Sequence, residues 1–232
     1  MAVPIYSSPQ SAPLYAAPPY KYNSYRKVSV FCRVAESEIR RFLPPAFDVR
    51  GDVIEFFIMN VPDGGALGSY KEGGIVVPVS YSGRSGGHVL YEIVTNDDSM
   101  AVGREVWGYP KKMGNVEWWD NGGLSAKASL SRRGTDLIKI EFTGNGQNFE
   151  KPVLHPRFQT RIVPSPEGPE VQTQIIENSL GESLIRNHST GTATIELGGN
   201  PSDPFSDFKI SDIVGAEFVV ADFVLGYGKV VS

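Results

Sequence analysis

The residues best suited to chemistry lie in one short stretch, residues 103–114, which reads GREVWGYPKKMG. It places the adjacent lysines Lys111 and Lys112 beside Trp107 and Tyr109. A free lysine amine has a pKa of about 10.4, so roughly one molecule in a few thousand is neutral at pH 7. Only the neutral amine attacks a carbonyl to form a Schiff base. Composition alone indicates a solvated turn, and aromatic neighbours that exclude water are the feature that favours a nucleophile.

Burial is the main way to obtain such an amine. Lowering the lysine pKa to about 6–7 requires a penalty of about 5 kcal/mol on the charged form. A second cation about 8 Å away contributes only about 2 kcal/mol at an effective dielectric of about 20. Successive side chains on a strand point to opposite faces, so Lys112 need not approach Lys111. We therefore expect desolvation in a pocket walled by aromatic residues to supply most of the shift.

The rarest residue types exclude several other chemistries. The chain has one cysteine, Cys32, so an intrachain disulfide and a cysteine-based zinc site are excluded, and the unpaired thiol favours the cytoplasm. Its three histidines lie far apart, without the His-pair spacing of metalloproteases. A net charge of −4 argues against nucleic acid as a partner, and no apolar stretch approaches the length of a membrane span.

The sequence pattern predicts that the elements that position the lysines are mostly strands. The chain contains 25 Gly and 17 Pro, and turn-forming clusters separate short apolar segments. Acids early and bases late, followed by two prolines, predict a short helix over 36–43. The expected fold is mainly β with a few short helices, an antiparallel barrel or sandwich. The predicted strands are 27–34, 53–61, 75–81, 88–94, 116–119, 124–130, 137–142, 158–163, 171–176, 192–197, 213–220 and 227–231.

Two regions are expected along the chain. Residues 1–20 contain five prolines and no charged residue, which favours an extended arm that packs over the body or reaches a neighbouring subunit. This segment lacks the basic and apolar regions of a secretory signal. Residues 21–232 have no internal repeat or break in composition, so we expect them to form a single domain.

The stretch AVGREVWGYPKKMG, residues 101–114, resembles the signature of the acetoacetate decarboxylase family, in which Gly-Arg-Glu is followed shortly by Pro-Lys-Lys. That enzyme is a known example of lysine activation by desolvation or a neighbouring cation. The resemblance covers most of residues 20–231 and implies that family's antiparallel β-barrel. It implies no metal or organic cofactor, since the lysine imine is itself the electron sink. Supporting matches in the family's order lie at 20–22, 43–44, 56–59, 69–74, 78–79 and 221–223.

Carried over residue by residue, the resemblance makes Lys111 the Schiff-base lysine and Lys112 its adjacent lysine. Glu72 corresponds to the acidic residue that assists proton transfer, and its alternative is an exposed turn glutamate. Glu92 is a second carboxylate that related sequences often place near the lysine, with an ordinary rim glutamate as the alternative.

Other candidates are expected to line the substrate-binding pocket. Arg104 and Glu105 fall in the signature, either as a structural ion pair or as site-lining groups. The candidates for an aromatic pocket, each with ordinary core as its alternative, are Phe57, Trp107, Tyr109 and Tyr227.

Three departures from the family pattern bear on the substrate. Tyr25 stands where decarboxylating members have an arginine, and Arg26, one position on, would face the other side of a strand. Phe57 replaces a glutamate and makes the pocket more apolar. Near the C-terminus Tyr227 stands in place of Pro-Arg, as in members that act as aldolase-dehydratases or on larger substrates. The changes are compatible with imine formation and point away from acetoacetate itself.

The leading hypothesis is a lyase that decarboxylates a β-keto acid, bulkier than acetoacetate, through an imine on Lys111. An aldolase-dehydratase is the nearest alternative, in which an enamine from pyruvate attacks an aldehyde and Tyr227 is the acid/base. A third hypothesis, from another class, is a non-catalytic barrel that binds a small apolar or keto-acid ligand. The expected partners are a small keto acid and, by resemblance, further copies of the chain.

Overall fold

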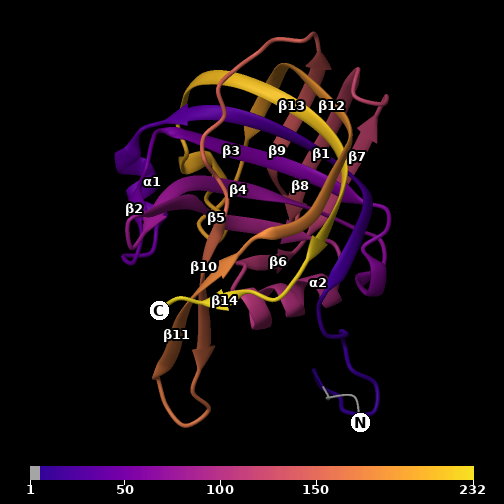
Figure 1. Cartoon of the computed structure of the whole chain (residues 1–232). Coiled ribbons are helices and arrows are strands. Elements are labelled where there is room, and N and C mark those ends of the chain that lie inside the picture. The colour runs from indigo at the N-terminus through magenta and orange to yellow at the C-terminus, as the bar shows by residue number, and fades with distance from the viewer. Residues whose placement is uncertain (1–5) are drawn as a thin grey trace.

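The computed structural model describes residues 6–232, and most of them lie in the strands of one large sheet (Figure 1). The mainly β prediction is confirmed. Pairing is antiparallel except at β5, which runs parallel to β6 and β10. The strands are β1 (Tyr20–Val34), β2 (Asp48–Val49), β3 (Val53–Val61), β4 (Tyr70–Tyr81), β5 (Arg84–Val94), β6 (Lys111–Met113), β7 (Asn115–Asp120), β8 (Ser125–Arg132), β9 (Thr135–Gly144), β10 (Arg157–Pro164), β11 (Val171–Asn178), β12 (Leu180–Leu197), β13 (Ile210–Leu225) and β14 (Lys229–Val230).

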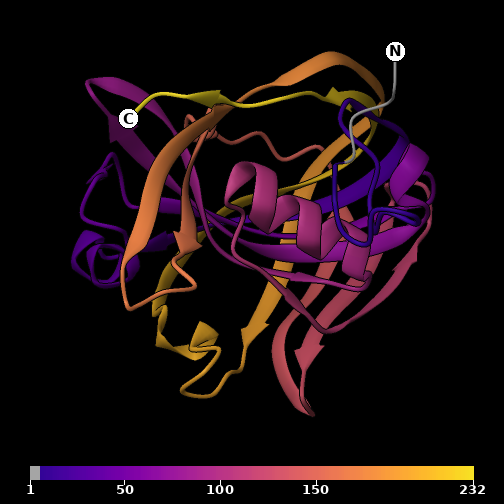
Figure 2. The same ribbon diagram turned by 90° about the horizontal axis from the view of Figure 1, so that it is seen from below.

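The strand order brings distant parts of the chain together. It runs β14-β11-β10-β5-β4-β3-β1-β13-β12-β9-β8-β7, with β2 on β4 and β6 on β5. Helix α1 (Glu36–Phe42) follows β1, as predicted, while α2 (Asp97–Val102) had no prediction. Single helical turns are η1 (Gly65–Leu67), η2 (Gly103–Trp107) and η3 (Phe205–Asp207). Figure 2 shows α2 and η2 lying across one face of the sheet.

Two apolar clusters cover the two faces of the central strands. In β3, Phe56 and Ile58 belong to the larger cluster, whereas Phe57 and Met59 belong to the smaller one. The alternation follows from the pleat of a strand, and the apolar run 53–61 is buried on both faces as its composition predicts. Each fully buried side chain of this size stabilises the fold by about 1.5–3 kcal/mol. The smaller cluster surrounds the candidate site described below.

Strand β12 is much longer than its predicted segment. It begins at Leu180, twelve residues before 192, and its first nine residues are exposed. The polar sequence there lacks apolar alternation, so pairing with β13 is decided by backbone hydrogen bonds that composition does not reveal.

The described part of the predicted N-terminal arm, residues 6–20, contacts the body of the molecule. Tyr15 is buried, and its hydroxyl donates a hydrogen bond to the carboxylate of Glu105. Tyr20, the last residue of the predicted arm, is the first residue of β1, and its ring packs edge-on against Trp107 at 6.1 Å between centroids. Residues 1–5, which the arm prediction also includes, lie outside the described residues.

Candidate active site

Lys111 is positioned by a compact helical segment that leads into β6. The Asn96 side chain accepts the Ser99 N–H at 3.0 Å and caps α2, which continues into the π-helical turn η2. The turn ends at Gly108, whose φ of 81° is left-handed. A Cβ there would lie 2.6 Å from the backbone N of Arg161, so glycine is required by conformation and by the close approach of β10.

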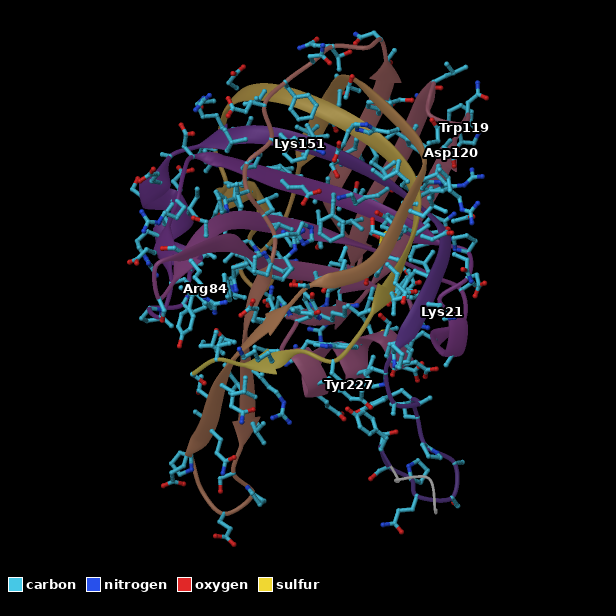
Figure 3. The ribbon with its side chains drawn as sticks, in the orientation of Figure 1. Lys21, Arg84, Trp119, Asp120, Lys151 and Tyr227 are labelled. Atoms are coloured by element: carbon cyan, nitrogen blue, oxygen red, sulfur yellow. The ribbon has the colours of Figure 1, made fainter. Side chains whose placement is uncertain are left out.

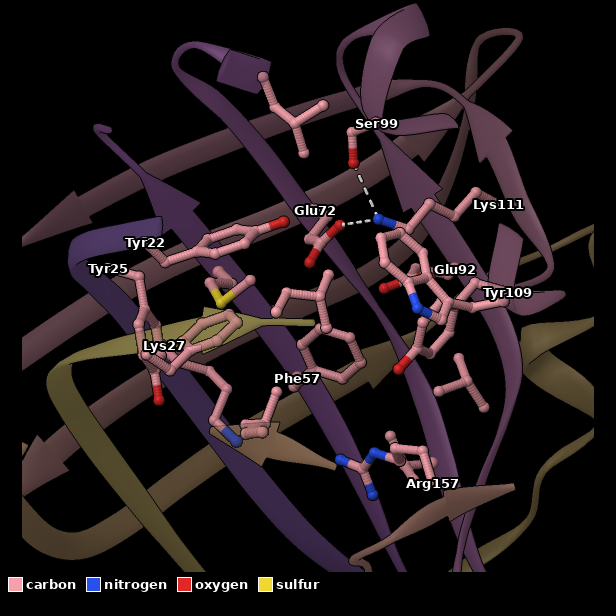
Figure 4. A pocket seen from close by; sticks show the side chains of 18 of the residues that line it. Tyr22, Tyr25, Lys27, Phe57, Glu72, Glu92, Ser99, Tyr109, Lys111 and Arg157 are labelled. Carbon is pink, nitrogen blue, oxygen red and sulfur yellow. Dashed lines mark hydrogen bonds and ion pairs between the residues drawn. The ribbon is translucent and has the colours of Figure 1, made fainter. Parts of the chain in front are cut away.

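The amine of Lys111 is buried between a carboxylate and a hydroxyl (Figure 4). Its Nζ donates to Glu72 Oε2 at 2.7 Å and to Ser99 Oγ at 2.8 Å. The rings of Tyr70 and Tyr109 lie 5.7 Å and 5.9 Å from Nζ. The residue is only 7% exposed, so the aromatic neighbours exclude water as the sequence leads one to expect.

The charge state of Lys111 differs from the expectation drawn from burial alone. Burial does lower the pKa of the ammonium, but the Glu72 carboxylate, joined by Glu92 when that group is ionised, outweighs this effect and raises the pKa above its ordinary value. An opposite charge at hydrogen-bonding distance favours the charged form more than desolvation opposes it. In the free protein, Lys111 and Glu72 therefore form an ion pair, and a neutral amine requires that the proton move to a partner.

Glu92 is the second carboxyl group of the site. Burial, opposed by Lys111, raises its pKa to about 8. Among residues 6–232, its Oε2 has no hydrogen-bond partner. Parallel pairing of β5 with β6 sets Glu92 opposite Lys111. At neutral pH the group is a buried carboxylic acid with a proton to donate, and not a rim glutamate.

Seven of the predicted site residues line one cavity of about 150 Å³. Its walls combine aromatic and aliphatic side chains with the three ionisable groups described above. The predicted residues that line it are Tyr25, Phe57, Glu72, Glu92, Trp107, Tyr109 and Lys111.

Four predicted residues do not line this cavity in the described chain, so their assignment to the site is corrected. They are Arg104, Glu105, Lys112 and Tyr227. Lys112 turns away, because neighbouring side chains on a strand alternate, and its Nζ donates to Asp203 Oδ1 at 2.8 Å. Tyr227, between β13 and β14, is 61% exposed (Figure 3).

Arg104 and Glu105 act on the backbone and the arm instead of on each other. Arg104 donates to the carbonyl of Lys111 at 3.0 Å and supports the loop that holds it. The Glu105 carboxylate accepts the hydrogen bond from Tyr15. Within residues 6–232, the ion pairs do not include one between Arg104 and Glu105, so the structural ion pair that the sequence suggested is not formed.

Several lining residues were missed by sequence reasoning. Ser99 comes from the unpredicted helix α2, and Lys27 and Arg157 bring two further cations. The period of two along β1 was a usable signal for Lys27, since it shares a face with Tyr25. Arg26 instead pairs with Asp120 at 2.8 Å and does not line the cavity. No comparable signal marks Arg157, at the start of β10.

Metal-binding clusters and membrane-spanning helices are both absent from the described residues. In residues 6–232, no group of three or more His, Cys, Asp and Glu side chains is arranged to hold a metal ion. Over the same range, the helices are all too short or too polar to cross a membrane.

Known proteins match this chain over nearly its whole length. A family model described as acetoacetate decarboxylase (ADC) matches residues 2–232. An acetoacetate decarboxylase 1 of Mesorhizobium japonicum is 26% identical, covering 97% of this chain and 93% of its own length. A crystal structure of acetoacetate decarboxylase from Legionella pneumophila superposes with a TM-score of 0.88 at 24% identity, covering all of this chain and 92% of that one. The enduracididine biosynthesis enzyme MppR complexed with pyruvate has a TM-score of 0.83 at 20% identity, covering 100% and 99% of the two chains.

Proposed function

Since this chain belongs to the acetoacetate decarboxylase family, we propose that it is a lyase that decarboxylates a β-keto acid through an imine on Lys111. The observation that carries the proposal is the buried Lys111 amine, held by Glu72 and Ser99 at the wall of a largely apolar cavity. A buried lysine paired with a buried carboxylate has a cost in stability, and catalysis is a reason to keep it.

The ion pair itself supplies the neutral amine. As the ketone carbon approaches, the Lys111 ammonium transfers a proton along the 2.7 Å hydrogen bond to Glu72, which leaves two neutral groups in a pocket that disfavours charge. Glu92, protonated at neutral pH, adds no second negative charge that would hold the ammonium in place. Ser99 accepts one of the two N–H groups that remain on the amine and so helps to orient its lone pair.

The bond changes then follow from the amine. The Lys111 nitrogen attacks the ketone carbon, and Glu72 returns its proton to the ketone oxygen, which leaves as water and gives a cationic imine. The electrons of the bond between the α-carbon and the carboxylate flow into this imine, which releases carbon dioxide and forms an enamine. The Glu92 carboxyl group donates a proton to the enamine carbon and later regains one from solvent, and water hydrolyses the new imine to release the ketone and the Lys111 amine. The apolar walls around Phe57 speed the step that disperses charge.

Borohydride reduction tests the proposal directly. Incubation with 3-oxohexanoate, a bulkier β-keto acid than acetoacetate, followed by reduction and peptide mass mapping, should yield an adduct on Lys111. Lys111→Ala should yield none, while the matched control Lys112→Ala should still react, because Lys112 faces Asp203. Absence of an adduct with acetoacetate, 3-oxohexanoate and pyruvate from pH 5 to 9 would refute imine chemistry and support the ligand-binding alternative.

Product analysis separates decarboxylation from condensation. Release of carbon dioxide marks the proposed reaction, whereas a new carbon–carbon bond from pyruvate and an aldehyde marks the aldolase-dehydratase reaction. Tyr227, the acid/base candidate for that reaction, does not line the cavity of the described chain, which favours decarboxylation.

A further inference from the structure

The cavity has a second polar end, formed by three charged side chains on β1, β3 and β10. Glu55 accepts hydrogen bonds from Lys27 Nζ at 2.8 Å and from Ser29 Oγ at 2.7 Å. The Arg157 guanidinium lies 3.4 Å from the other Glu55 oxygen. Both cations line the cavity, whereas Glu55 does not. In Figure 4, Lys27 and Arg157 lie across the cavity from Lys111, beyond the ring of Phe57.

The charges at this end do not cancel. Lys27 and Arg157 carry two positive charges, and Glu55 carries one negative charge, since these cations outweigh burial and lower its pKa to about 2. The nearby His155 is neutral because burial and the same cations lower its pKa to about 3.

The remaining charged neighbours are already compensated. Glu217 is paired with Lys151 at 2.9 Å and also contacts His188. At the opposite wall, Lys111 is paired with Glu72, and burial raises the pKa of Glu92 to about 8, which favours its neutral form at neutral pH. With Glu92 neutral, the charged groups around the cavity sum to one positive charge, which Lys27 and Arg157 carry at the end away from the Lys111 amine.

The hydrogen-bonding capacity of Arg157 is also unfilled. Among residues 6–232, its guanidinium donates only to the Leu154 carbonyl and, at 3.4 Å, to Glu55. A guanidinium has five N–H donors in a planar fork that matches a carboxylate. Its side chain is only 13% exposed, so bulk water cannot fully replace the missing acceptors. A desolvated arginine with free donors and a net positive field is a binding site for an anion.

We infer that Arg157 and Lys27 bind a carboxylate carried by the substrate at its end remote from the ketone. The apolar stretch between the two polar ends, with Phe57, Val76 and Val89 in its walls, takes the intervening carbon chain. The preferred substrate is then a dicarboxylic β-keto acid, in which one carboxylate leaves as carbon dioxide and the other is retained. The position of the ketone relative to this anion site rests on the proposed function, whereas the anion site itself does not.

Calorimetry with unreactive ligands tests the anion site without any imine. Hexanoate and 1-hexanol share a carbon chain and differ in charge. The wild-type protein should bind hexanoate at least tenfold more tightly than 1-hexanol, and Arg157→Gln should remove this preference. Arg33→Gln is the matched control, because Arg33 lies on β1 in an exposed pair with Asp52 and should leave the preference intact. Equal affinity of the wild-type protein for the two ligands would overturn the inference, as would equal weakening of both by Arg157→Gln.

A second measurement links the anion site to Lys111. The compounds 5-oxohexanoate and 2-hexanone both carry a ketone that can be trapped by borohydride, and neither loses carbon dioxide. Half-maximal trapping should need at least tenfold less 5-oxohexanoate, and Lys27→Gln should reduce that advantage even if Arg157→Gln does not fold. A hexanoate preference without trapping of either ketone would retain the anion site and refute the proposed function. Half-maximal trapping of both ketones at equal concentrations would refute the anion site and retain the proposed function.

Discussion

Lys111 and Lys112 are neighbours in sequence, but their amines lie in separate ion pairs. Lys111 Nζ pairs with Glu72 at 2.7 Å inside the cavity, and Lys112 Nζ pairs with Asp203 at 2.8 Å outside it. The cause is the pleat of β6, which directs successive side chains to opposite faces. Proximity of the second ammonium is therefore a minor influence on the first, and the charge state of Lys111 is decided by burial and by carboxyl groups.

Lys112→Met should affect stability and leave the chemistry nearly unchanged. Asp203 is buried and accepts hydrogen bonds from both Lys112 and Arg132, so loss of one partner should lower the free energy of unfolding by about 1–2 kcal/mol. Urea unfolding measures this, and the rate of borohydride trapping at Lys111 should stay within threefold of wild type. A trapping rate reduced a hundredfold would instead assign Lys112 a direct role in the reaction.

Glu72→Gln should change both the rate and the pH dependence of imine formation. The amide keeps the shape of the side chain but cannot accept the Lys111 proton, so turnover should fall about 100-fold or more. With the largest pKa-raising partner gone, burial dominates and the midpoint of the pH–trapping curve should move to lower pH. Glu105→Gln, which alters a carboxylate outside the cavity, serves as the control. An unchanged midpoint would contradict the role of Glu72.

Glu92→Gln should flatten the pH dependence of stability between about 4.5 and 8. The pKa of Glu92 is raised to about 8 in the folded protein, so the folded state retains a proton that the unfolded state releases above its ordinary pKa. Stability from this proton is complete at low pH and is lost as pH rises toward 8. Urea unfolding from pH 5 to 8 should therefore show a smaller decline in the variant. Parallel curves for the two proteins would show that Glu92 ionises normally.

Gly103→Ala should displace the reactive amine. A Cβ on Gly103 would lie 2.7 Å from Lys111 Cδ and 2.9 Å from Cε, so the lysine chain must shift and its hydrogen bonds to Glu72 and Ser99 must lengthen. We expect trapping to slow at least tenfold while the fold persists. Gly181→Ala is the control, since its Cβ would meet only the Val224 carbonyl at 3.8 Å. Equal trapping rates in both variants would show that the Lys111 chain adapts without losing its position.

Local patterns predicted the parts of the fold that depend on side-chain burial. The apolar run 53–61 and the helix after β1 correspond to β3 and α1, because burial on two faces and an ordered charge gradient leave marks in composition. The first half of β12 and helix α2 left no such mark. The first half of β12 depends on backbone pairing with β13, which any sequence can form, whereas α2 is capped by the Asn96 side chain, a local signal that had not been used to predict it.

By itself the sequence determined the family, through the likeness of residues 101–114 to its signature, and it predicted lysine as the reactive residue type. The period of two also indicated that Lys112 need not approach Lys111, although Lys112 was still grouped with the site, which the structure corrects. Only the tertiary structure decided the charges around Lys111, because Glu72, Glu92 and Ser99 come from three separate elements. The same holds for Arg157, which lies 130 residues from Lys27 in the chain. Electrostatic interactions depend on distance in space and on burial, and neither quantity is encoded in the spacing of residues along the chain.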